Sequence, residues 1–454
     1  MGAGPTGLML GVQLARRGVR VMVIDKNAGP SVRTKALGVQ ARTLEIYSKL
    51  GIAEQALELG TRAVGATMWV RGRRAARVPL GNAGTGLSPF PFLLILVQDD
   101  NERLLGGKLR ELGGVVRWST ELVGIDQHAD GVTATLRHPD GATARVEADR
   151  LAGCDGSRSA VRQLCGIDFP GAPYEHVFFV ADARAIGPMV PGELNVYLWR
   201  GGFHLFFPMR GAGHWRAVGI LPVPLRGRDG VGFDDVTPHI RGQVGPALRF
   251  TGCDWFSTYR IHHRRAARFR DRRCFLLGDA AHVHSPVGAQ GMNTGLQDAY
   301  NLAWKLALVS SGRAAESLLD TYEAERIPVA ERLLGTTDRA FSVLVSDGWL
   351  AGQLRTRVMP RVWRGRCPSS AGVASRSASS RRRVSATRAA CCRRMPRALP
   401  MGRRDPGTGS RGCRGVRPRT DQSRTCSPGS TTLGSRSCCS GRMRRPMRAG
   451  RTPT

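Results

Sequence analysis

The sequence predicts an α/β protein with a nucleotide-binding domain, a second domain built on a β-sheet, and a carboxyl-terminal tail that does not fold. Three observations lead to this fold class. The chain begins with a glycine-rich loop and a helix, residues 174–260 are rich in strand-forming aromatic residues, and residues 366–454 contain few apolar side chains.

The first domain is indicated by its glycine loop. Gly2, Gly4 and Gly7 form the pattern G-x-G-x-x-G, which places a pyrophosphate at a helix N-terminus when it forms the turn between a strand and a helix. A predicted strand over residues 19–25 ends in Asp25, where a carboxylate can bind the ribose of an adenosine. We therefore predict a Rossmann-like unit that binds a dinucleotide; a plain tight turn is the alternative.

Only Met1 precedes this loop, although the loop requires a buried strand before it. We therefore expect that the first strand of the domain is missing and that the start is misplaced, with a valine codon GTG written as Met1. Unpaired backbone groups in a buried sheet cost about 1–3 kcal/mol each, so this strand matters for stability. Upstream in-frame codons that encode an apolar strand would support the expectation.

Helices and strands alternate along the rest of the chain. Apolar periodicity predicts helices over residues 8–18, 38–60 and 99–112, and a β-rich excursion over 61–97. The boundaries that we assign are 1–170 and 265–365 for the two parts of the nucleotide-binding domain, 171–264 for the sheet domain, and 366–454 for the tail.

Residues 272–312 carry the most informative pattern. A short buried strand, CFLL, leads into the turn GDAAH, and an amphipathic helix begins near residue 290 and closes at Gly312. The free N–H groups at the start of this helix favour negative charge, which suits a ring that becomes anionic on reduction. Asp279, at the end of the strand, can accept hydrogen bonds from sugar hydroxyls.

Three segments together resemble a known family. GAGPTG (2–7), AGCDGSRSAVR (152–162) and GDAAHVHSPVGAQGMNTGLQDAYNLAWKL (278–306) are similar to the motifs of FAD-dependent aromatic-ring hydroxylases. These are the class A flavoprotein monooxygenases of the p-hydroxybenzoate hydroxylase fold, here most like the 3-(3-hydroxyphenyl)propionate and polyketide hydroxylases. The resemblance covers about residues 1–360. It implies a GR2-type FAD-binding domain with a substrate-binding sheet.

The resemblance also implies roles for particular residues. Those that would bind the ADP half of FAD are Gly2, Gly4, Gly7 and Asp25. Asp155 would serve both FAD and NAD(P)H, and Asp279 would bind the ribitol chain. Gly291 and Asn293 would offer backbone N–H groups to the flavin. Residues at positions that often contact FAD are Arg33, Arg42 and Gln98. Asp155-Gly156 read alone is equally well an ordinary turn before a Ser-capped helix.

For the substrate, Pro286 matches a position whose carbonyl lies close to substrate and flavin. Tyr197, Trp199 and His204 would either line a substrate cavity or belong to the core. Ala289 stands where the family most often has glycine, and we expect this small methyl group to be tolerated. His282 and His284 lack a third ligand at suitable spacing, so we predict no metal site.

The implied reaction is reduction of FAD by NAD(P)H, addition of O2 at flavin C4a to give a hydroperoxide, and hydroxylation of a phenolic or polyketide-like aromatic. The cofactor supplies this chemistry, and no protein group is nominated as a catalytic residue. The alternatives are a flavin-dependent reductase or dehydrogenase of the same fold, and an inactive product of a truncated or frameshifted gene.

The net charge of +33 suggests nucleic acid as a partner, but residues 351–454 alone hold 26 Arg and only two acidic residues. Residues 366–454 contain no Phe, Tyr or Trp, so the aromatic residues that stack on bases are missing and we predict no nucleic-acid binding. The longest apolar run, FPFLLILV (90–97), is too short to cross a membrane. Four scattered cysteines in residues 1–350 indicate a reducing cytoplasm, and we expect a monomer or homodimer.

The tail, residues 366–454, is dominated by Arg, Ser, Gly, Pro and Cys. Such a composition cannot offset the roughly 1–2 kcal/mol per residue of backbone ordering entropy, so we expect disorder. Absence of Lys beside so many Arg is typical of GC-rich DNA translated out of frame, and we expect a frameshift near codon 365. A genuine basic, disordered tail is the alternative.

Overall fold

The computed structural model describes residues 1–32, 36–82, 84–285, 289–346, 349–359 and 361–362. The predicted tail and the predicted site residues Arg33 and Pro286 lie outside these ranges. The described α-helices are α1 (Pro5–Ala15), α2 (Ala41–Leu50), α3 (Ala53–Leu59), α4 (Gln98–Glu111), α5 (Ala160–Leu164), α6 (Phe233–Val244), α7 (Gly291–Ser310), α8 (Asp320–Val345) and α9 (Trp349–Gln353). Shorter helical turns are η1 (Val223–Leu225), η2 (Gly278–Ala280), η3 (Glu316–Leu319) and the π-helical η4 (Leu354–Val358).

Parallel strand pairs form the centre of the first lobe. β1 (Val23–Ile24) pairs with β7 (Val116–Arg117), and β11 (Leu151–Gly153) pairs with β18 (Cys274–Leu276). The antiparallel β17 (Arg270–Asp271) continues from β18. Of the strand predicted over residues 19–25, the structure has only Val23 and Ile24 as β1. The strand is this short because its partner β7 is also only two residues long.

The first two residues of the chain lie between these two strand pairs. Met1 donates its ammonium group to Ala152 O (2.9 Å) and accepts a hydrogen bond from Cys154 N (2.7 Å). Gly2 N donates to Ile24 O (2.8 Å). Met1 and Gly2 thus connect the edge of β11 to the edge of β1 in the position of a central parallel strand.

The helix predicted over residues 38–60 is wrong in its continuity. The structure has two helices, α2 and α3, separated by Gly51. Gly51 adopts a left-handed conformation (φ +72°) and its N–H bonds to Ser48 O and Tyr47 O, which ends α2. A glycine at this position is a common helix stop because it has no Cβ to clash in the left-handed region.

An eight-stranded sheet forms the second lobe, in the order β19-β16-β12-β15-β14-β13-β4-β5. Its strands are β4 (Gly65–Val70), β5 (Arg73–Pro79), β12 (Gly171–Ile186), β13 (Glu193–Trp199), β14 (Gly202–Pro208), β15 (His214–Ile220), β16 (Arg249–Arg265) and β19 (His282–Val283). All neighbours are antiparallel except β13 and β4. Two strands of the β-rich excursion, β4 and β5, therefore belong to this sheet.

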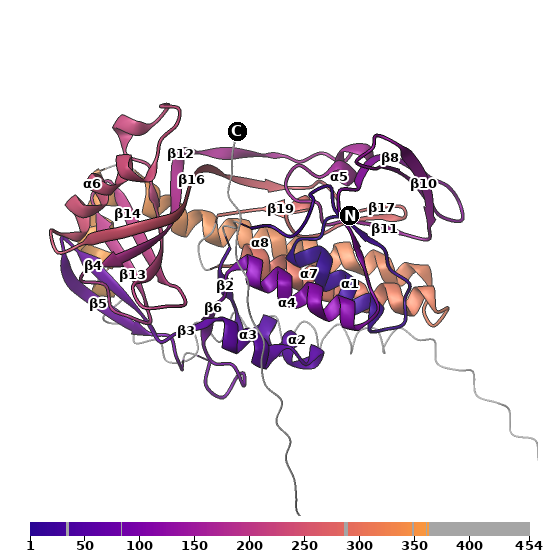
Figure 1. Cartoon of the computed structure of the whole chain (residues 1–454), viewed down its shortest axis with the longest axis horizontal. Coiled ribbons are helices and arrows are strands. Elements are labelled where there is room, and N and C mark those ends of the chain that lie inside the picture. The colour runs from indigo at the N-terminus through magenta and orange to yellow at the C-terminus, as the bar shows by residue number, and fades with distance from the viewer. Residues whose placement is uncertain (33–35, 83, 286–288, 347–348, 360, 363–454) are drawn as a thin grey trace, which may run out of the picture. The chain divides into compact units, whose positions relative to one another are not determined.

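The long strands β12 and β16 run from this sheet toward the first lobe, where β16 pairs with β19 (Figure 1). The described parts of both lobes thus belong to one compact unit. Smaller sheets are formed by β2 (Gly38–Val39), β6 (Leu93–Ile95) and β3 (Thr61–Ala63), and by the meander β8 (Glu121–Gln127), β9 (Val132–Arg137) and β10 (Thr143–Ala148).

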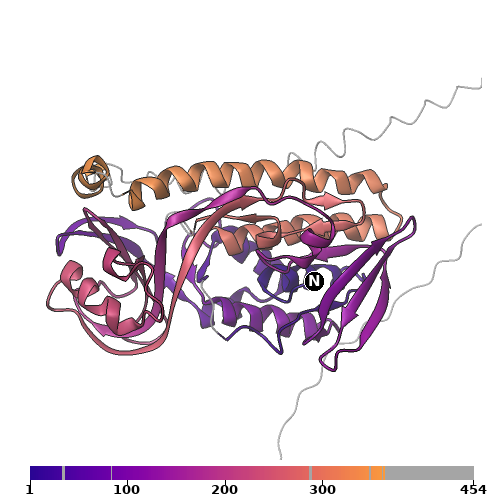
Figure 2. The ribbon, with the colours of Figure 1, turned by 90° about the horizontal axis from the view of Figure 1, so that it is seen from above.

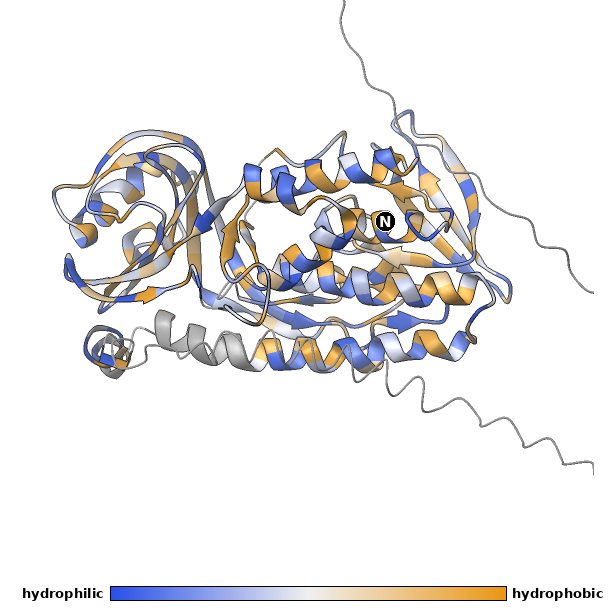
Figure 3. Ribbon diagram, turned by 90° about the horizontal axis from the view of Figure 1, so that it is seen from below, coloured by the Kyte–Doolittle hydropathy of each residue, from blue (hydrophilic) through white to orange (hydrophobic). Residues whose placement is uncertain are grey.

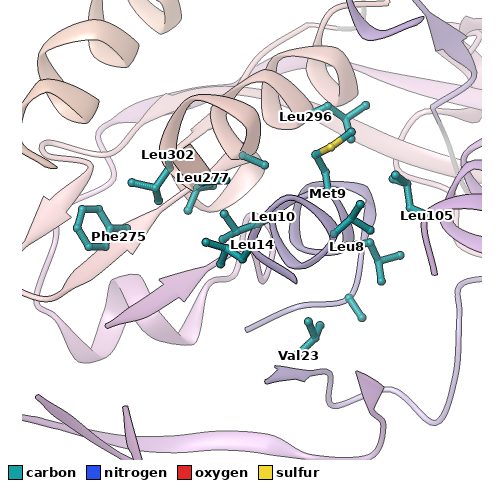
Figure 4. Packing of buried hydrophobic residues seen from close by; sticks show 14 of the residues in the cluster. Leu8, Met9, Leu10, Leu14, Val23, Leu105, Phe275, Leu277, Leu296 and Leu302 are labelled. Atoms are coloured by element: carbon teal, nitrogen blue, oxygen red, sulfur yellow. The ribbon is translucent and has the colours of Figure 1, made fainter. Parts of the chain in front are cut away.

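Helix α1 lies at the centre of the first hydrophobic core. Its side chains from Leu8 to Leu14 are buried, and α1 packs between α7, α4 and the strands (Figure 4). Helix α8 lies beside α7 (Figure 2), and Tyr322 and Ala330 of α8 join the same core. Hydrophilic and hydrophobic residues alternate along the described part of α8 (Figure 3), as expected for a helix with one buried face. None of the described helices is long and apolar enough to cross a bilayer.

Close packing of α1 on α7 depends on glycine. A Cβ placed on Gly295 of α7 would lie 2.3 Å from Thr6 Oγ1 and 3.2 Å from Gly278 Cα. A Cβ on Gly278 would lie 2.7 Å from the same Thr6 oxygen. Glycine at both positions therefore allows the first turn of α1 to contact the turn that follows β18.

We expect Gly295→Ala to lower the free energy of unfolding by about 1–3 kcal/mol, because its methyl group overpacks the α1–α7 contact. Gly106→Ala is the matched control. Gly106 is also inside a helix, α4, but its Cβ would meet no atom within 4 Å. That substitution should stabilise the protein by about 0.5–1 kcal/mol. Urea unfolding followed by circular dichroism measures both; equal effects would contradict the packing argument.

Candidate functional site

The glycine loop has the geometry of a cradle. Gly2 has φ +90°, and a Cβ on it would lie 2.3 Å from Cys154 O. A Cβ on Gly7 would lie 1.9 Å from Gly2 O. Gly4, which caps the N-terminus of α1, would meet no atom within 4 Å. Gly2 and Gly7 are thus required by close backbone contacts, whereas the space beside Gly4 is open to a ligand.

Asp25 follows β1 and faces this loop. Its Oδ2 accepts a hydrogen bond from Ala3 N (2.7 Å), and its Oδ1 accepts one from Asn27 N (2.9 Å). The structure therefore brings the carboxylate predicted to bind ribose next to the glycine loop. Its distance from the loop backbone is set by the bond to Ala3.

A second carboxylate, Glu102, lies nearby and was missed by the sequence analysis. It is 3% exposed, and it accepts hydrogen bonds from Gln98 Nε2 (2.8 Å) and Ser31 N (3.2 Å). Burial raises the pKa of Glu102, and the negative charge of Asp25 adds to this effect against the two hydrogen bonds. The predicted FAD contact Gln98 thus starts α4 and orients Glu102. An acid on the buried side of an amphipathic helix was the available signal.

Asp155 lies directly against the glycine loop, since a Cβ on Gly2 would lie 2.9 Å from Asp155 Cα. Its carboxylate accepts hydrogen bonds from Ser159 Oγ (2.6 Å) and Val161 N (3.2 Å) at the start of α5. Ser159 caps this helix by accepting from Arg162 N (3.0 Å). The turn before a Ser-capped helix therefore exists, and it also lies beside the glycine loop.

Arg162 connects this segment to the turn after β18. Arg162 is 5% exposed, and its guanidinium donates to Ser157 O (2.8 Å) and Ala280 O (2.9 Å). It also lies 3.9 Å from the ring centre of Phe169. The D-G and G-D segments, more than a hundred residues apart, are thus joined by one side chain.

Asp279 projects from η2, the turn after β18. Its side chain is exposed, yet protein surrounds it on most sides, and this burial raises its pKa while the charge of His282 opposes the rise. Gly278, just before it, has φ +57°, which only glycine adopts readily. A carboxylate that reaches solvent from an otherwise enclosed turn is suited to accept hydrogen bonds from a hydroxylated ligand.

Behind this turn lies a buried ionic cluster centred on Asp298 of α7, which the sequence analysis did not single out. Asp298 is fully buried and accepts hydrogen bonds from Gly278 N (3.1 Å), His282 Nε2 (2.7 Å) and Arg326 Nε (2.5 Å). Burial alone raises its pKa, but the charges and hydrogen bonds of Arg326 and His282 outweigh burial and lower the pKa below its usual range. Asp298 therefore fixes the backbone that presents Asp279.

The N-terminus of α7 is tied to β2 and α2 by Asn293. Its Nδ2 donates to Gly38 O and Ala289 O (2.7 Å each), and its Oδ1 accepts from Gln40 N and Thr43 Oγ1. The first backbone bond of the helix runs from Thr294 N to Gln290 O (2.8 Å). The backbone N–H groups from Gly291 to Asn293 come before this bond and so have no acceptor within the helix. Such groups are available to donate hydrogen bonds to a ligand.

Ala289 occupies a left-handed conformation with φ +52°. A non-glycine residue in this region is strained. Its methyl group has room because residue 38 is glycine: a Cβ on Gly38 would lie 2.4 Å from Ala289 Cβ. The expectation that alanine is tolerated here therefore has a structural basis in Gly38.

Two further predicted residues are engaged in protein contacts. Arg42 pairs with Glu45 (2.8 Å) and lies over the ring of Tyr300 (5.8 Å). Tyr197 is 1% exposed on the sheet face that α6 covers, where it stacks on Trp69 (5.3 Å). Its contact with substrate remains a prediction. Among the described residues no group of three metal ligands occurs.

Comparison with known proteins agrees with this geometry. A profile of the FAD binding domain matches residues 1–337, so the chain belongs to the FAD binding domain family. FAD is the cofactor by which this family is defined. The predicted α/β class, with its nucleotide-binding lobe and sheet lobe, is confirmed.

Among its relatives is 6-methylpretetramide 4-monooxygenase of Streptomyces rimosus, 40% identical over 76% of this chain and 61% of that protein. Pentachlorophenol 4-monooxygenase of Sphingobium chlorophenolicum is 32% identical over 77% of this chain and 65% of that protein. The chain thus spans less than two thirds of the length of these two relatives. A solved complex of aklavinone-11 hydroxylase with FAD and aklavinone has a TM-score of 0.69 at 30% identity, covering 79% of this chain and 69% of the other.

We expect Asp298→Asn to lower the free energy of unfolding at pH 7 by about 3–5 kcal/mol, because it leaves the buried Arg326 without its counter-charge. Asp320→Asn is the matched control, since it breaks an exposed pair with Arg270 worth less than about 1 kcal/mol. The pKa of Asp298 is lowered in the folded protein, so its contribution is present above about pH 4 and is lost as the pH falls through the folded pKa. The difference between wild type and Asp298→Asn should therefore shrink in acid. A constant difference would contradict the pairing.

We expect Tyr197→Phe to raise the free energy of unfolding by about 1 kcal/mol, because the buried Tyr197 hydroxyl has no hydrogen-bond partner among the described residues. If the side chain only packs in the core, the KM for an aromatic substrate should not change. A tenfold rise in KM would instead show that the hydroxyl bonds to substrate. Unfolding and steady-state kinetics on one preparation separate these outcomes.

Proposed function

We propose that this protein is an FAD-dependent monooxygenase that hydroxylates a phenolic or polyketide-like aromatic compound, using NAD(P)H and O2. The observation that carries the proposal is the convergence of three distant segments. Gly2 contacts Asp155, and Arg162 joins that segment to the turn bearing Asp279. This arrangement supports one extended nucleotide site rather than three unrelated turns.

The described residues fit FAD. The open space beside Gly4 at the start of α1 suits the pyrophosphate, and Asp25 suits the adenosine ribose. Asp279 is accessible for the ribitol hydroxyls. When bound and reduced by NAD(P)H, FAD would supply the activation of O2 and the transfer of one oxygen atom to an electron-rich ring.

The protein contributes orientation and electrostatics. The N–H groups from Gly291 to Asn293, together with the dipole of α7, stabilise negative charge at the end of that helix. Asn293 fixes this end through four hydrogen bonds, and Asp298 fixes the neighbouring turn. Asn293 and Asp298 thus order the site before any ligand binds, which reduces the free-energy cost of ordering the site on binding.

For the substrate, we propose the side of the large sheet that faces the nucleotide-binding lobe. Phe207 of β14 packs against a small buried cluster of the first lobe that consists of Leu37, Ala63 and Ile95. Pro286, which lies outside the described residues, is retained as a proposed substrate contact on the ground of the sequence resemblance alone. The relatives' names point to polyketide and phenolic rings, and we extend that class to this chain.

We also propose the cytoplasm as location, since the described cysteines are free thiols. A monomer or homodimer without nucleic acid is the assembly we propose. NADH and NADPH are both retained as candidate reductants.

The test is oxidation of NADPH or NADH by the flavin-loaded protein in the presence of phenols and tetracyclic polyketides. We expect one aromatic class to accelerate coenzyme oxidation and to yield a product that contains one oxygen atom from labelled O2. Asp279→Asn should weaken FAD binding about 10- to 100-fold, since it removes the negative charge that strengthens hydrogen bonds from the ligand hydroxyls and replaces one acceptor oxygen by a donor.

Asp130→Asn, in the exposed turn between β8 and β9, makes the same charge change and should leave FAD affinity unaltered. Fluorescence titration of FAD measures both variants. Coenzyme oxidation without oxygen in the product would favour a reductase of the same fold. Failure to retain FAD would contradict the proposal.

A further inference from the structure

Two histidines meet where helix α6 covers the large sheet. His204 of β14 is 1% exposed, and the centre of its ring lies 4.3 Å from that of Trp199 and 5.6 Å from that of His239 in α6. His239 is half-buried, and its ring centre lies 5.6 Å from that of Trp199. The ring of His204 is thus enclosed between the sheet and α6.

His204 has no polar partner in this position. Both of its ring nitrogens are buried without a hydrogen bond to any described residue. A Cβ on Gly219 of the neighbouring strand β15 would lie 2.3 Å from its Nδ1, so glycine at that position leaves room for the ring. A buried imidazolium without a partner costs far more free energy than a neutral imidazole. His204 is therefore compatible with this packing only when it is neutral.

The groups around the two rings favour their neutral forms. Tyr197 of β13 lies directly opposite His204, and the ring of Phe179 in β12 lies 5.7 Å away. Burial lowers the pKa of His204 well below its usual range, and the charge of His239 acts in the same direction. Burial also lowers the pKa of His239.

The charged side chains of α6 do not compensate for this burial. Asp235, one turn before His239, pairs with Arg228 (3.2 Å). Asp234 and Arg241 are exposed. Among the described residues, no carboxylate is hydrogen-bonded or ion-paired to either histidine.

Helix α6 is held by its packing on the sheet. Pro238, inside the helix, lacks the N–H group that a regular helical hydrogen bond needs. Gly232 and Gly245 flank the helix at its two ends. Three apolar side chains attach it to the core of the sheet face: Val236, Ile240 and Val244.

We propose that His204 and His239 make the docking of α6 acid-sensitive, so that this helix separates from the sheet in mildly acidic solution. Protonation places a positive charge on either ring, and the charged ring is stable only where water reaches it. Separation of α6 would expose His204, because His239 and the rest of the helix cover it. The proposal does not rest on the proposed function, and its test needs no cofactor.

Docking of α6 should weaken as the pH falls. An exposed histidine has a pKa of about 6.5, whereas the pKa values of His204 and His239 are lowered in the docked state. The stability that the neutral rings confer is complete above about pH 6.5 and is lost as the pH falls toward the pKa of the docked state. Within that range, each pH unit should raise the opening constant about tenfold for each fully buried histidine.

Hydrogen–deuterium exchange of the full-length protein measures this opening. Exchange of peptides that cover α6, corrected for the chemical exchange rate, should accelerate about tenfold or more between about pH 7.5 and about pH 5.5. Peptides that cover α2, which contains no histidine, should not change. An equal acceleration in α2 would show acid unfolding of the whole protein and would overturn the proposal.

His204→Leu replaces the titrating ring by an apolar side chain of similar size and should reduce the acceleration in α6 about tenfold. His239→Gln tests the same contact from the half-buried side, where a change of side chain is more easily accommodated. His128→Gln, at an exposed position after β8, is the control and should behave like the wild type. Circular dichroism at neutral pH verifies the fold of each variant. Exchange of α6 that is independent of pH in the wild type, or full acceleration in both α6-contact variants, would contradict the proposal.

Discussion

The buried carboxylate of Asp298 is the contact on which the candidate site depends. It accepts a backbone hydrogen bond from the turn that presents Asp279, and it is itself held by His282 and Arg326 from two other elements. A desolvated charge is costly unless it is fully paired. Pairing therefore restricts α7, α8 and the turn after β18 to one relative position. The position of the Asp279 carboxylate is fixed in turn, because that turn carries it.

The elements of the first lobe were largely predictable, because their signals are local. The glycine loop, the acid at the end of β1 and the amphipathic α7 depend on spacings within a few turns of chain. The break at Gly51 was missed because apolar periodicity continues across it, while the left-handed conformation that ends α2 is only one of several that glycine permits. Membership of β4 and β5 in the large sheet was also missed, since pairing between distant strands leaves no local pattern.

Within the candidate site, residues predicted to face a ligand were easier to anticipate from the sequence than residues that support them. Asp279 and Gly291 belong to recognisable motifs, whereas Glu102, Arg162 and Asp298 act through partners far away in sequence. Tyr197 shows the opposite difficulty. Strand alternation cannot tell which face of a sheet is covered by a helix, and here α6 covers the face that bears its ring.

The contact between Gly38 and Ala289 has a consequence for how these positions can vary. The methyl group of Ala289 occupies the space that a side chain at position 38 would need. The two sites are therefore coupled rather than independent, and their substitution energies should not add. If residue 289 is glycine, this clash is absent and position 38 can carry a side chain. If residue 289 is alanine, position 38 must be glycine. The pair amounts to a steric covariation, in which a strained alanine at one end of α7 dictates the absence of a side chain on β2.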